Sequence, residues 1–168
     1  MEKAFWLSRW SSNNIQFHLD NVNPLLVDAI NTLSLREGQR LFVPLCGKTL
    51  DIAWLLSKGY RVVGIELSEA AVKQLFDAME IEPSVEKRGE FTLFYSKGVD
   101  IFVGDIFNLT QALLGSVQAV YDRAALVALP SKMRSRYTAH LSHLTHRAQQ
   151  LLITYTYDQD LAQGPPFC

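Results

Sequence analysis

The sequence predicts an α/β fold built on a doubly wound, mainly parallel sheet. The first observation is a short apolar run at 41–43, which is typical of a strand buried on both faces. The second is the segment directly after this run: Pro44 ends the strand, Gly47 permits a tight turn, and residues 50–56 indicate a largely buried helix. The third is that apolar strand segments and helical segments alternate along the rest of the chain. A strand, a glycine turn and a helix form the opening of a nucleotide-binding βαβ unit.

The residues before this strand predict a helical cover over 1–38. Residues 4–10 can form one or two helical turns, and two tryptophans so close to a terminus indicate that it packs down. A second helix is expected to begin at Asn23-Pro24, since asparagine caps helices and proline suits the first helical position. A chain of 168 residues is expected to form one domain, with its Rossmann-like core at 39–168.

The later part of the chain predicts four more parallel strands, a hairpin and the helices between them. Right-handed crossovers place the first strand centrally, the second and third on one side, and the fourth and fifth on the other. Ligand is expected beyond the carboxyl ends of the strands, where the winding reverses. The expected strands are 60–65, 99–103, 117–121 and 151–157, the hairpin is 85–95, and the helices are 69–79, 110–114 and one that begins at Pro130.

Acidic residues lie at the ends of two of these strands. Glu66 follows Gly47 by nineteen residues, and an acidic side chain at this position can accept hydrogen bonds from both ribose hydroxyls of a nucleoside. The alternative is that Glu66 only begins the helix from Ser68. Asp105 can meet the edge of an adenine while Ile106 packs on the ring face, or it can cap the loop after its strand.

An arginine, a cysteine and the histidines are the other residues whose roles need to be considered. Arg123 ends the fourth strand in an apolar context, and its guanidinium needs a partner, either Asp122 or a substrate or cofactor group. Cys46 is expected to be a small buried thiol rather than a nucleophile, because no base can be located by motif. The histidines show no metal-ligand spacing, so no metal is expected, and three of them are expected to be solvated along one helix: His140, His143 and His146.

Composition and motifs exclude several classes of function. Sixteen basic and seventeen acidic residues nearly cancel and no basic run is present, so nucleic acid is not an expected partner. No apolar stretch suits a membrane span, and neither a signal peptide nor a disulfide framework is visible, so we expect a cytoplasmic protein. The turn has one glycine and lacks the G-x-G-x-x-G fingerprint, which counts against NAD or FAD. A nicotinamide-dependent oxidoreductase stays open as an alternative because of Glu66.

A set of short motifs spreads over essentially the whole chain. They are Phe5-Trp6, Arg9-Trp10, Phe17-His18, Asn23-Pro24-Leu25-Leu26, Val43-Pro44-Leu45-Cys46-Gly47-Lys48 with Asp51, Val63-Gly64-Ile65-Glu66-Leu67-Ser68, Gly104-Asp105-Ile106-Phe107, Tyr121-Asp122-Arg123-Ala124-Ala125-Leu126 and Gly164-Pro165-Pro166-Phe167. With these motifs the sequence resembles the bacterial branch of the thiopurine S-methyltransferase family. The Pro-Leu-Cys-Gly-Lys string followed by Tyr-Asp-Arg-Ala-Ala is far more specific than a generic glycine turn.

The resemblance implies a class I methyltransferase fold and a transferase that uses S-adenosyl-L-methionine and releases S-adenosyl-L-homocysteine. It implies methylation of sulfur in aromatic or heterocyclic thiols such as thiopurines, and bacterial relatives are also associated with selenium and tellurium compounds. Phe17 matches a position near the substrate, and Arg123 is the residue expected to act on the acceptor. The cofactor contacts that the resemblance implies are Trp10, Leu45, Glu66, Asp105, Ile106 and Arg123. Gly47 is expected to bind the cofactor as well, because its tight turn lets the backbone approach the ligand.

The sequence departs from this family at its end. Family members continue beyond Gly-Pro-Pro-Phe with a further helix and the last two strands of the sheet, whereas this sequence stops at Cys168. The acceptor pocket is therefore expected to be open, and a domain that binds cofactor but is impaired in catalysis is the alternative function. The expected partner is a small-molecule thiol. A monomer is expected, with dimerisation through the exposed edge of the fifth strand as the alternative.

Overall fold

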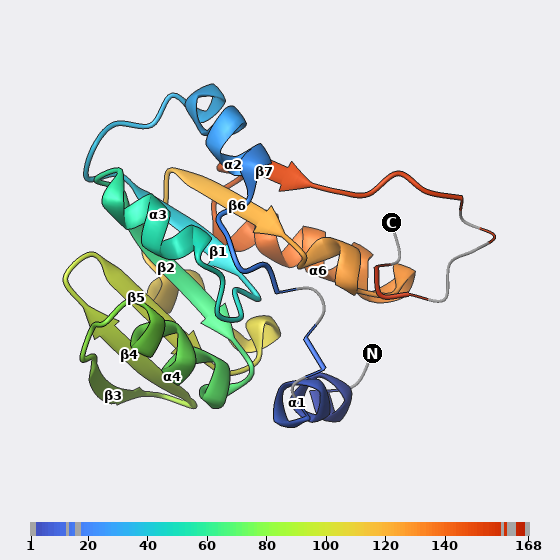
Figure 1. Cartoon of the computed structure of the whole chain (residues 1–168), viewed down its shortest axis with the longest axis horizontal. Helices are drawn as coiled ribbons and strands as arrows, with labels where there is room; N and C mark the ends of the chain where they lie inside the picture. Colours follow the sequence, from blue (N-terminus) through green and yellow to red (C-terminus); the bar gives the residue numbers. More distant parts are fainter. Residues whose placement is uncertain (1–2, 13, 16–17, 159, 161–163, 167–168) are drawn as a thin grey trace.

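The fold is one seven-stranded sheet in the order β3-β4-β5-β2-β1-β6-β7 (Figure 1). The computed structural model describes residues 3–12, 14–15, 18–158, 160 and 164–166. Among them, no helix has the length and apolar character needed to cross a bilayer. The strands are β1 (Arg40–Pro44), β2 (Arg61–Glu66), β3 (Ser84–Arg88), β4 (Phe91–Ser96), β5 (Val99–Val103), β6 (Ala119–Arg123) and β7 (Gln149–Ile153).

The strand order confirms the predicted doubly wound topology. Five strands run parallel, with β1 central, β2 and β5 on one side, and β6 and β7 on the other. The predicted hairpin is β3 and β4, which extends the sheet antiparallel to β5. The winding therefore reverses between β1 and β6, and the carboxyl ends of these two strands form the crevice in which such folds bind ligands.

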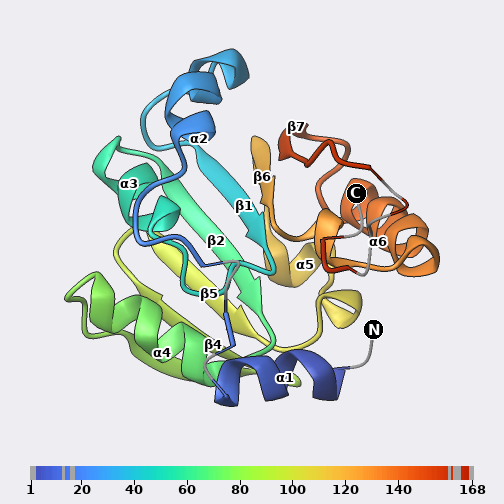
Figure 2. The same cartoon turned by 45° about the vertical axis from the view of Figure 1, so that its right-hand side comes forward.

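Helices cover both faces of this sheet (Figures 1 and 2). Leu41 and Val43 of β1 pack into the core on one face, while Phe42 between them packs into the core on the other. On the first face lie α2 (Pro24–Ala29), the 3-10 turn η1 (Ile30–Leu33), α3 (Asp51–Ser57) and α4 (Glu69–Ala78). On the second lie η2 (Ile106–Asn108), α5 (Gln111–Leu114), η3 (Leu126–Ala128) and α6 (Ser131–Leu144).

Helix α1 (Lys3–Ser11) belongs to neither layer. It contacts α4 and lies across the end of the sheet toward which the arrowheads of β1 and β2 point (Figure 2). None of its residues is fully buried. The first helix of the chain thus faces the ligand end of the sheet.

The last strand differs from its prediction. Apolar residues predicted 151–157, but β7 is Gln149–Ile153, paired in register with Ala119–Arg123 of β6. The ladder stops there because β6 ends at Arg123 and the next residue, Ala124, turns into the left-handed region with a φ of 60°. Two exposed glutamines begin β7, so apolar periodicity could not reveal its first residues.

Candidate active site

A cavity of about 600 Å³ lies at the carboxyl ends of the parallel strands. Its walls come from α1, from the loops after β1, β2, β5 and β6, from α6, and from the C-terminal segment that holds Tyr155, Pro165 and Pro166. Phe17, the predicted substrate residue, lies outside the described residues. Every predicted cofactor contact lines this one cavity: Trp10, Leu45, Gly47, Glu66, Asp105, Ile106 and Arg123.

Gly47 and Glu66 are joined directly across the floor of the cavity. The Gly47 backbone N–H donates to Glu66 Oε2 at 2.8 Å. Gly47 has a φ of 54°, and a Cβ atom at this residue would lie 3.0 Å from Cζ2 of Trp10. Glycine is therefore favoured here for two reasons, the left-handed backbone conformation and the indole ring packed against it.

Glu66 is almost completely buried, and its carboxylate organises the end of β2. Oε1 accepts hydrogen bonds from the backbone N–H groups of Leu67 and Ser68 at 2.8 and 2.9 Å. Burial raises the pKa of Glu66, and these bonds, with that from Gly47 and one from the Trp10 side chain, oppose the shift. The Ser68 hydroxyl caps α4 by accepting from the Ala71 backbone N–H, so Glu66 is not the cap of this helix. Glu66 instead lines the cavity.

Two residues at this site carry backbone strain. Leu45 and Ala124 have φ values of 46° and 60°, in a region that side chains with a Cβ atom rarely occupy. They follow β1 and β6, the two strands between which the winding reverses, and both line the cavity. Backbone strain in the loops on both sides of a ligand crevice is typical of functional loops.

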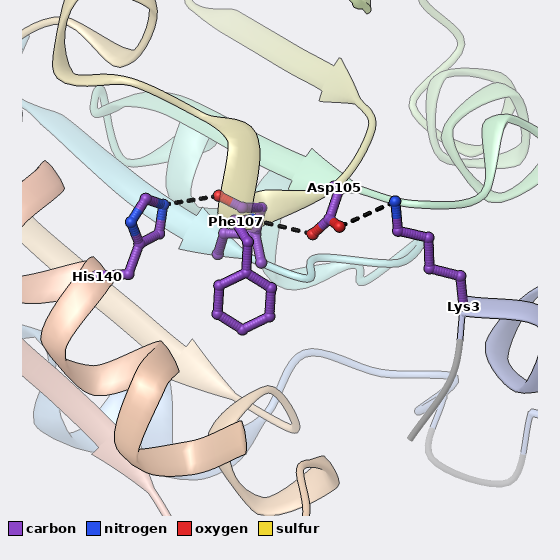
Figure 3. A network of polar contacts seen from close by, with 5 residues as sticks. Lys3, Asp105, Phe107 and His140 are labelled. Carbon is purple, nitrogen blue, oxygen red and sulfur yellow. Dashed lines mark hydrogen bonds and ion pairs between the residues drawn. The ribbon is translucent and has the colours of Figure 1, made fainter. Parts of the chain in front are cut away.

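Asp105 serves first as a cap, the alternative that its sequence position left open. Its Oδ1 accepts from the Phe107 backbone N–H at 3.0 Å, and its Oδ2 lies 2.9 Å from Nζ of Lys3 on α1 (Figure 3). The expectation that His140 is solvated is wrong. Its Nε2 lies 2.8 Å from the carbonyl oxygen of Ile106, which fixes α6 against the loop after β5.

Arg123 and Asp122 have separate roles. Both carboxylate oxygens of Asp122 accept hydrogen bonds, Oδ1 from Leu126 N at 3.0 Å and Oδ2 from the Tyr137 hydroxyl at 2.6 Å. Asp122 thereby ties β6 to α6, and its burial raises its pKa. The next side chain along the strand, Arg123, is half-buried and lines the cavity.

Asp51 is a second buried carboxylate in the lining of the cavity. Asp51 Oδ1 accepts from the Asn23 backbone N–H and Oδ2 accepts from the Tyr121 hydroxyl, each at 2.8 Å. Burial, followed by the charge of Asp51, raises the pKa of Tyr121, so the tyrosine stays a hydrogen-bond donor. Cys46 is buried, and burial raises the pKa of its thiol, which confirms that it is an interior thiol.

Sequence reasoning missed several residues of the cavity. His18 and Lys48 line it from the segments after α1 and β1, and Arg136 lines it from α6 with its guanidinium carbon 4.0 Å from the centroid of the Phe107 ring. His18 stood in a quoted motif but was assigned no role, because no base motif includes it. Only the tertiary structure brings it to the same cavity as Arg123.

Comparisons with known proteins agree with this architecture. The family model described as thiopurine S-methyltransferase matches residues 1–168. The chain belongs to the thiopurine S-methyltransferase family. A thiopurine S-methyltransferase of Teredinibacter turnerae is 52% identical over 167 residues, with 99% of this chain and 78% of the relative covered. One of Xanthobacter autotrophicus is 54% identical over 168 residues, with 99% and 79% covered.

Solved structures of other methyltransferases share this fold. Magnesium protoporphyrin IX methyltransferase from Synechocystis, with bound S-adenosylhomocysteine, matches with a TM-score of 0.62 at 16% identity, over 86% of this chain and 68% of the other. A methyltransferase from Thiobacillus denitrificans in complex with S-adenosylhomocysteine gives a TM-score of 0.54 at 16% identity, over 86% and 52%. The predicted fold class and the predicted enzyme class, an S-adenosylmethionine-dependent methyltransferase, are both confirmed.

Proposed function

We propose that this chain transfers the methyl group of S-adenosylmethionine to the sulfur of thiopurines and related aromatic or heterocyclic thiols. The observation that carries the proposal is the convergence of the seven predicted cofactor contacts on one cavity in a chain of this family. Methylation of selenium or tellurium compounds stays a prediction of the sequence resemblance. A cofactor-binding domain without catalysis is not favoured by the family match.

The lining suits an adenosyl sulfonium. The buried Glu66 carboxylate offers acceptors for ribose hydroxyls beside the left-handed turn at Gly47. Ile106 is buried with its side chain at the cavity wall, where it supports a flat apolar ring. Trp10, packed on Gly47, offers an aromatic face to a cationic sulfur.

The remaining lining suits an anionic acceptor. When bound, the cofactor supplies an electrophilic methyl group on a positively charged sulfur. The chain's contribution is to align the acceptor sulfur, hold its charge and exclude water. Cationic side chains supply a field that favours the thiolate over the thiol. Those that line the cavity are Lys3, Arg9, Lys48, Arg123 and Arg136.

The cofactor site is tested by calorimetric titration with S-adenosylhomocysteine. We expect the wild-type protein to bind and Glu66→Gln to bind at least about tenfold more weakly, because an amide accepts fewer hydrogen bonds than the carboxylate it replaces. Glu69→Gln is the matched control, since Glu69 is half-exposed on α4 and pairs with Lys73. Folded wild-type protein that binds no S-adenosylhomocysteine would contradict the proposal. Mass spectrometry of a thiopurine incubated with the protein and S-adenosylmethionine then tests the acceptor, because methylation adds the mass of one methyl group.

The role of Arg123 is tested by separating binding from turnover. Arg123→Ala is expected to reduce turnover of a thiopurine at saturating cofactor, because the guanidinium helps to hold the anionic acceptor. Arg36→Ala, which removes an exposed arginine side chain that does not line the cavity, is the control. A variant that loses only affinity for S-adenosylmethionine, with unchanged turnover at saturation, would restrict Arg123 to the cofactor.

A further inference from the structure

His18 lies in the cavity without a role in the proposed methyl transfer. It is half-buried in the segment between α1 and α2, and its backbone N–H donates to the Ile15 carbonyl at 2.8 Å. Its side chain lines the same cavity as Tyr121 and Arg123. Within the described part of the chain, no hydrogen bond holds its imidazole ring. The ring nitrogens are thus available to a ligand in the cavity.

The charges around His18 favour its neutral form. Burial is the largest cause that lowers its pKa, followed by the positive charge of Lys48 and, more weakly, that of Arg123. The carboxylates of Asp20 and Asp51 oppose the shift without reversing it. An imidazole with a pKa below its ordinary value of about 6.5 is neutral at physiological pH and carries one nitrogen lone pair that can accept a proton.

The carboxylates of the described lining, and the hydroxyl of Tyr121, already have hydrogen-bond or ion-pair partners. The Tyr121 hydroxyl donates to Asp51, whose other oxygen accepts from Asn23. The carboxylate of Glu66 accepts several backbone N–H bonds, and Asp105 is held by Phe107 and Lys3.

We propose that His18 is the proton acceptor for thiol substrates that enter the site un-ionised, an inference that rests on the proposed function. An electron pair of the thiol sulfur forms the new bond to the methyl carbon. The bond between that carbon and the sulfonium sulfur breaks, and its electron pair stays on that sulfur as a neutral thioether. The S–H proton passes to the free imidazole nitrogen of His18, and the imidazolium then releases it to solvent.

This step matters only for some acceptors. A heterocyclic thiol that ionises below the assay pH arrives as a thiolate and needs no base. An alkyl or benzyl thiol keeps its proton, and a neutral sulfur that gains a methyl group becomes a protonated thioether, a far stronger acid than imidazolium. Proton transfer to His18 during bond formation removes this unfavourable product.

The experiment compares two acceptors in His18→Gln at a pH between their thiol pKa values. We expect kcat/KM to fall about 100-fold for benzyl mercaptan, in line with the contribution of a general base, and by less than about threefold for an already ionised heterocyclic thiol. His143→Gln, which changes an exposed histidine outside the cavity, should leave both values unchanged. Equal losses for the two acceptors in His18→Gln would overturn the proposal. Wild-type protein that methylates neither acceptor would overturn the proposed function instead.

A second readout needs no turnover. Imidazole NMR signals of the wild-type protein, assigned by their loss in His18→Gln, are expected to give His18 a pKa below that of the exposed His143. Addition of benzyl mercaptan with S-adenosylhomocysteine should shift the His18 signal and leave the His143 signal in place. A His18 ring that stays protonated at neutral pH, or that does not respond to the thiol, would contradict a role as proton acceptor.

Discussion

Nζ of Lys3 lies 2.9 Å from Oδ2 of Asp105, and this ion pair ties α1 to the loop after β5 (Figure 3). Asp105 uses its other carboxylate oxygen to cap η2 through the Phe107 N–H. In the predicted adenine contact of Asp105, the amino group of the ring would bind the oxygen that Lys3 now pairs with. We therefore predict that Lys3 and the adenine of the cofactor compete for this acceptor oxygen.

Lys3→Met is expected to raise the affinity for S-adenosylhomocysteine by up to about fivefold, because the Lys3 side chain is 60% exposed and such pairs contribute less than about 1 kcal/mol. The free energy of unfolding should change by less than that amount. Titration calorimetry measures the affinity and thermal unfolding measures the stability, each at low and high salt. Because salt weakens the ion pair, the difference in affinity between Lys3→Met and wild type should be smaller at high salt. Lys132→Met, an exposed change on α6, is the control.

Weaker binding by Lys3→Met at every salt concentration would contradict this competition. Such a result would mean that Lys3 holds α1 in the position that the bound cofactor requires.

The sheet could be predicted from sequence because its central strands are short and continuously apolar. Leu41 to Val43 and the strands that flank them are buried, and the right-handed crossover rule then leaves few strand orders, of which the predicted one is observed. The edge strand β7 was misplaced for the opposite reason. Its ladder is set by where β6 ends, at Arg123, and not by its own apolar pattern.

The site could be predicted where function follows from a place at a strand end. Gly47, Glu66 and Asp105 were predicted in this way, and the structure brings them to one cavity. The partners of these residues were not found, because contacts such as Lys3 with Asp105 join segments that no local pattern relates. His18 was missed for the same reason.

Ala124 has a φ of 60°, whereas Ala125 beside it has a φ of −94°. Ala124→Gly is expected to stabilise the protein by up to about 1 kcal/mol, because glycine relieves the left-handed strain that alanine bears, while its greater freedom in the unfolded chain offsets part of the gain. Ala125→Gly has no strain to relieve and removes a buried methyl group, so it should destabilise by about 1 kcal/mol. Urea unfolding of the two variants measures the difference, and equal effects would show that Ala124 carries no strain.

Asp122 makes the stability of the protein depend on pH. Burial raises its folded-state pKa above the unfolded value of about 3.9, so the folded protein holds the proton more tightly. Its contribution to stability is present below that unfolded pKa and is lost as pH rises through the folded pKa. Asp122→Asn removes the loss of stability at higher pH, because an amide does not titrate. It keeps the hydrogen bonds with Tyr137 and Leu126, since the amide can donate to the Tyr137 hydroxyl and accept from Leu126.

Urea unfolding across the pH range should therefore show a flatter profile for Asp122→Asn and a stability at neutral pH no lower than that of wild type. Part of the slope remains, because the pKa of Glu66 is raised by the same cause. Tyr137→Phe is the contrasting variant, since it removes the hydroxyl that donates to Oδ2 of the buried carboxylate and should destabilise by about 1–3 kcal/mol at neutral pH. An unchanged slope in Asp122→Asn would show that Asp122 does not titrate in this range.

The bond from Tyr121 to Asp51 holds β6 against the start of α3. Tyr121→Phe leaves one oxygen of an almost fully buried carboxylate without this donor and is expected to destabilise by about 1–3 kcal/mol. Asp51→Asn keeps the bond from Asn23 and can donate to the Tyr121 hydroxyl, so its effect should be smaller. In the Asp51→Asn protein, Tyr121→Phe leaves no buried charge without a donor and should therefore destabilise less than it does in the wild-type protein. A double-mutant cycle measured by urea unfolding gives the coupling between the two residues. Equal effects of Tyr121→Phe in both backgrounds would mean that the hydroxyl does not support the Asp51 charge.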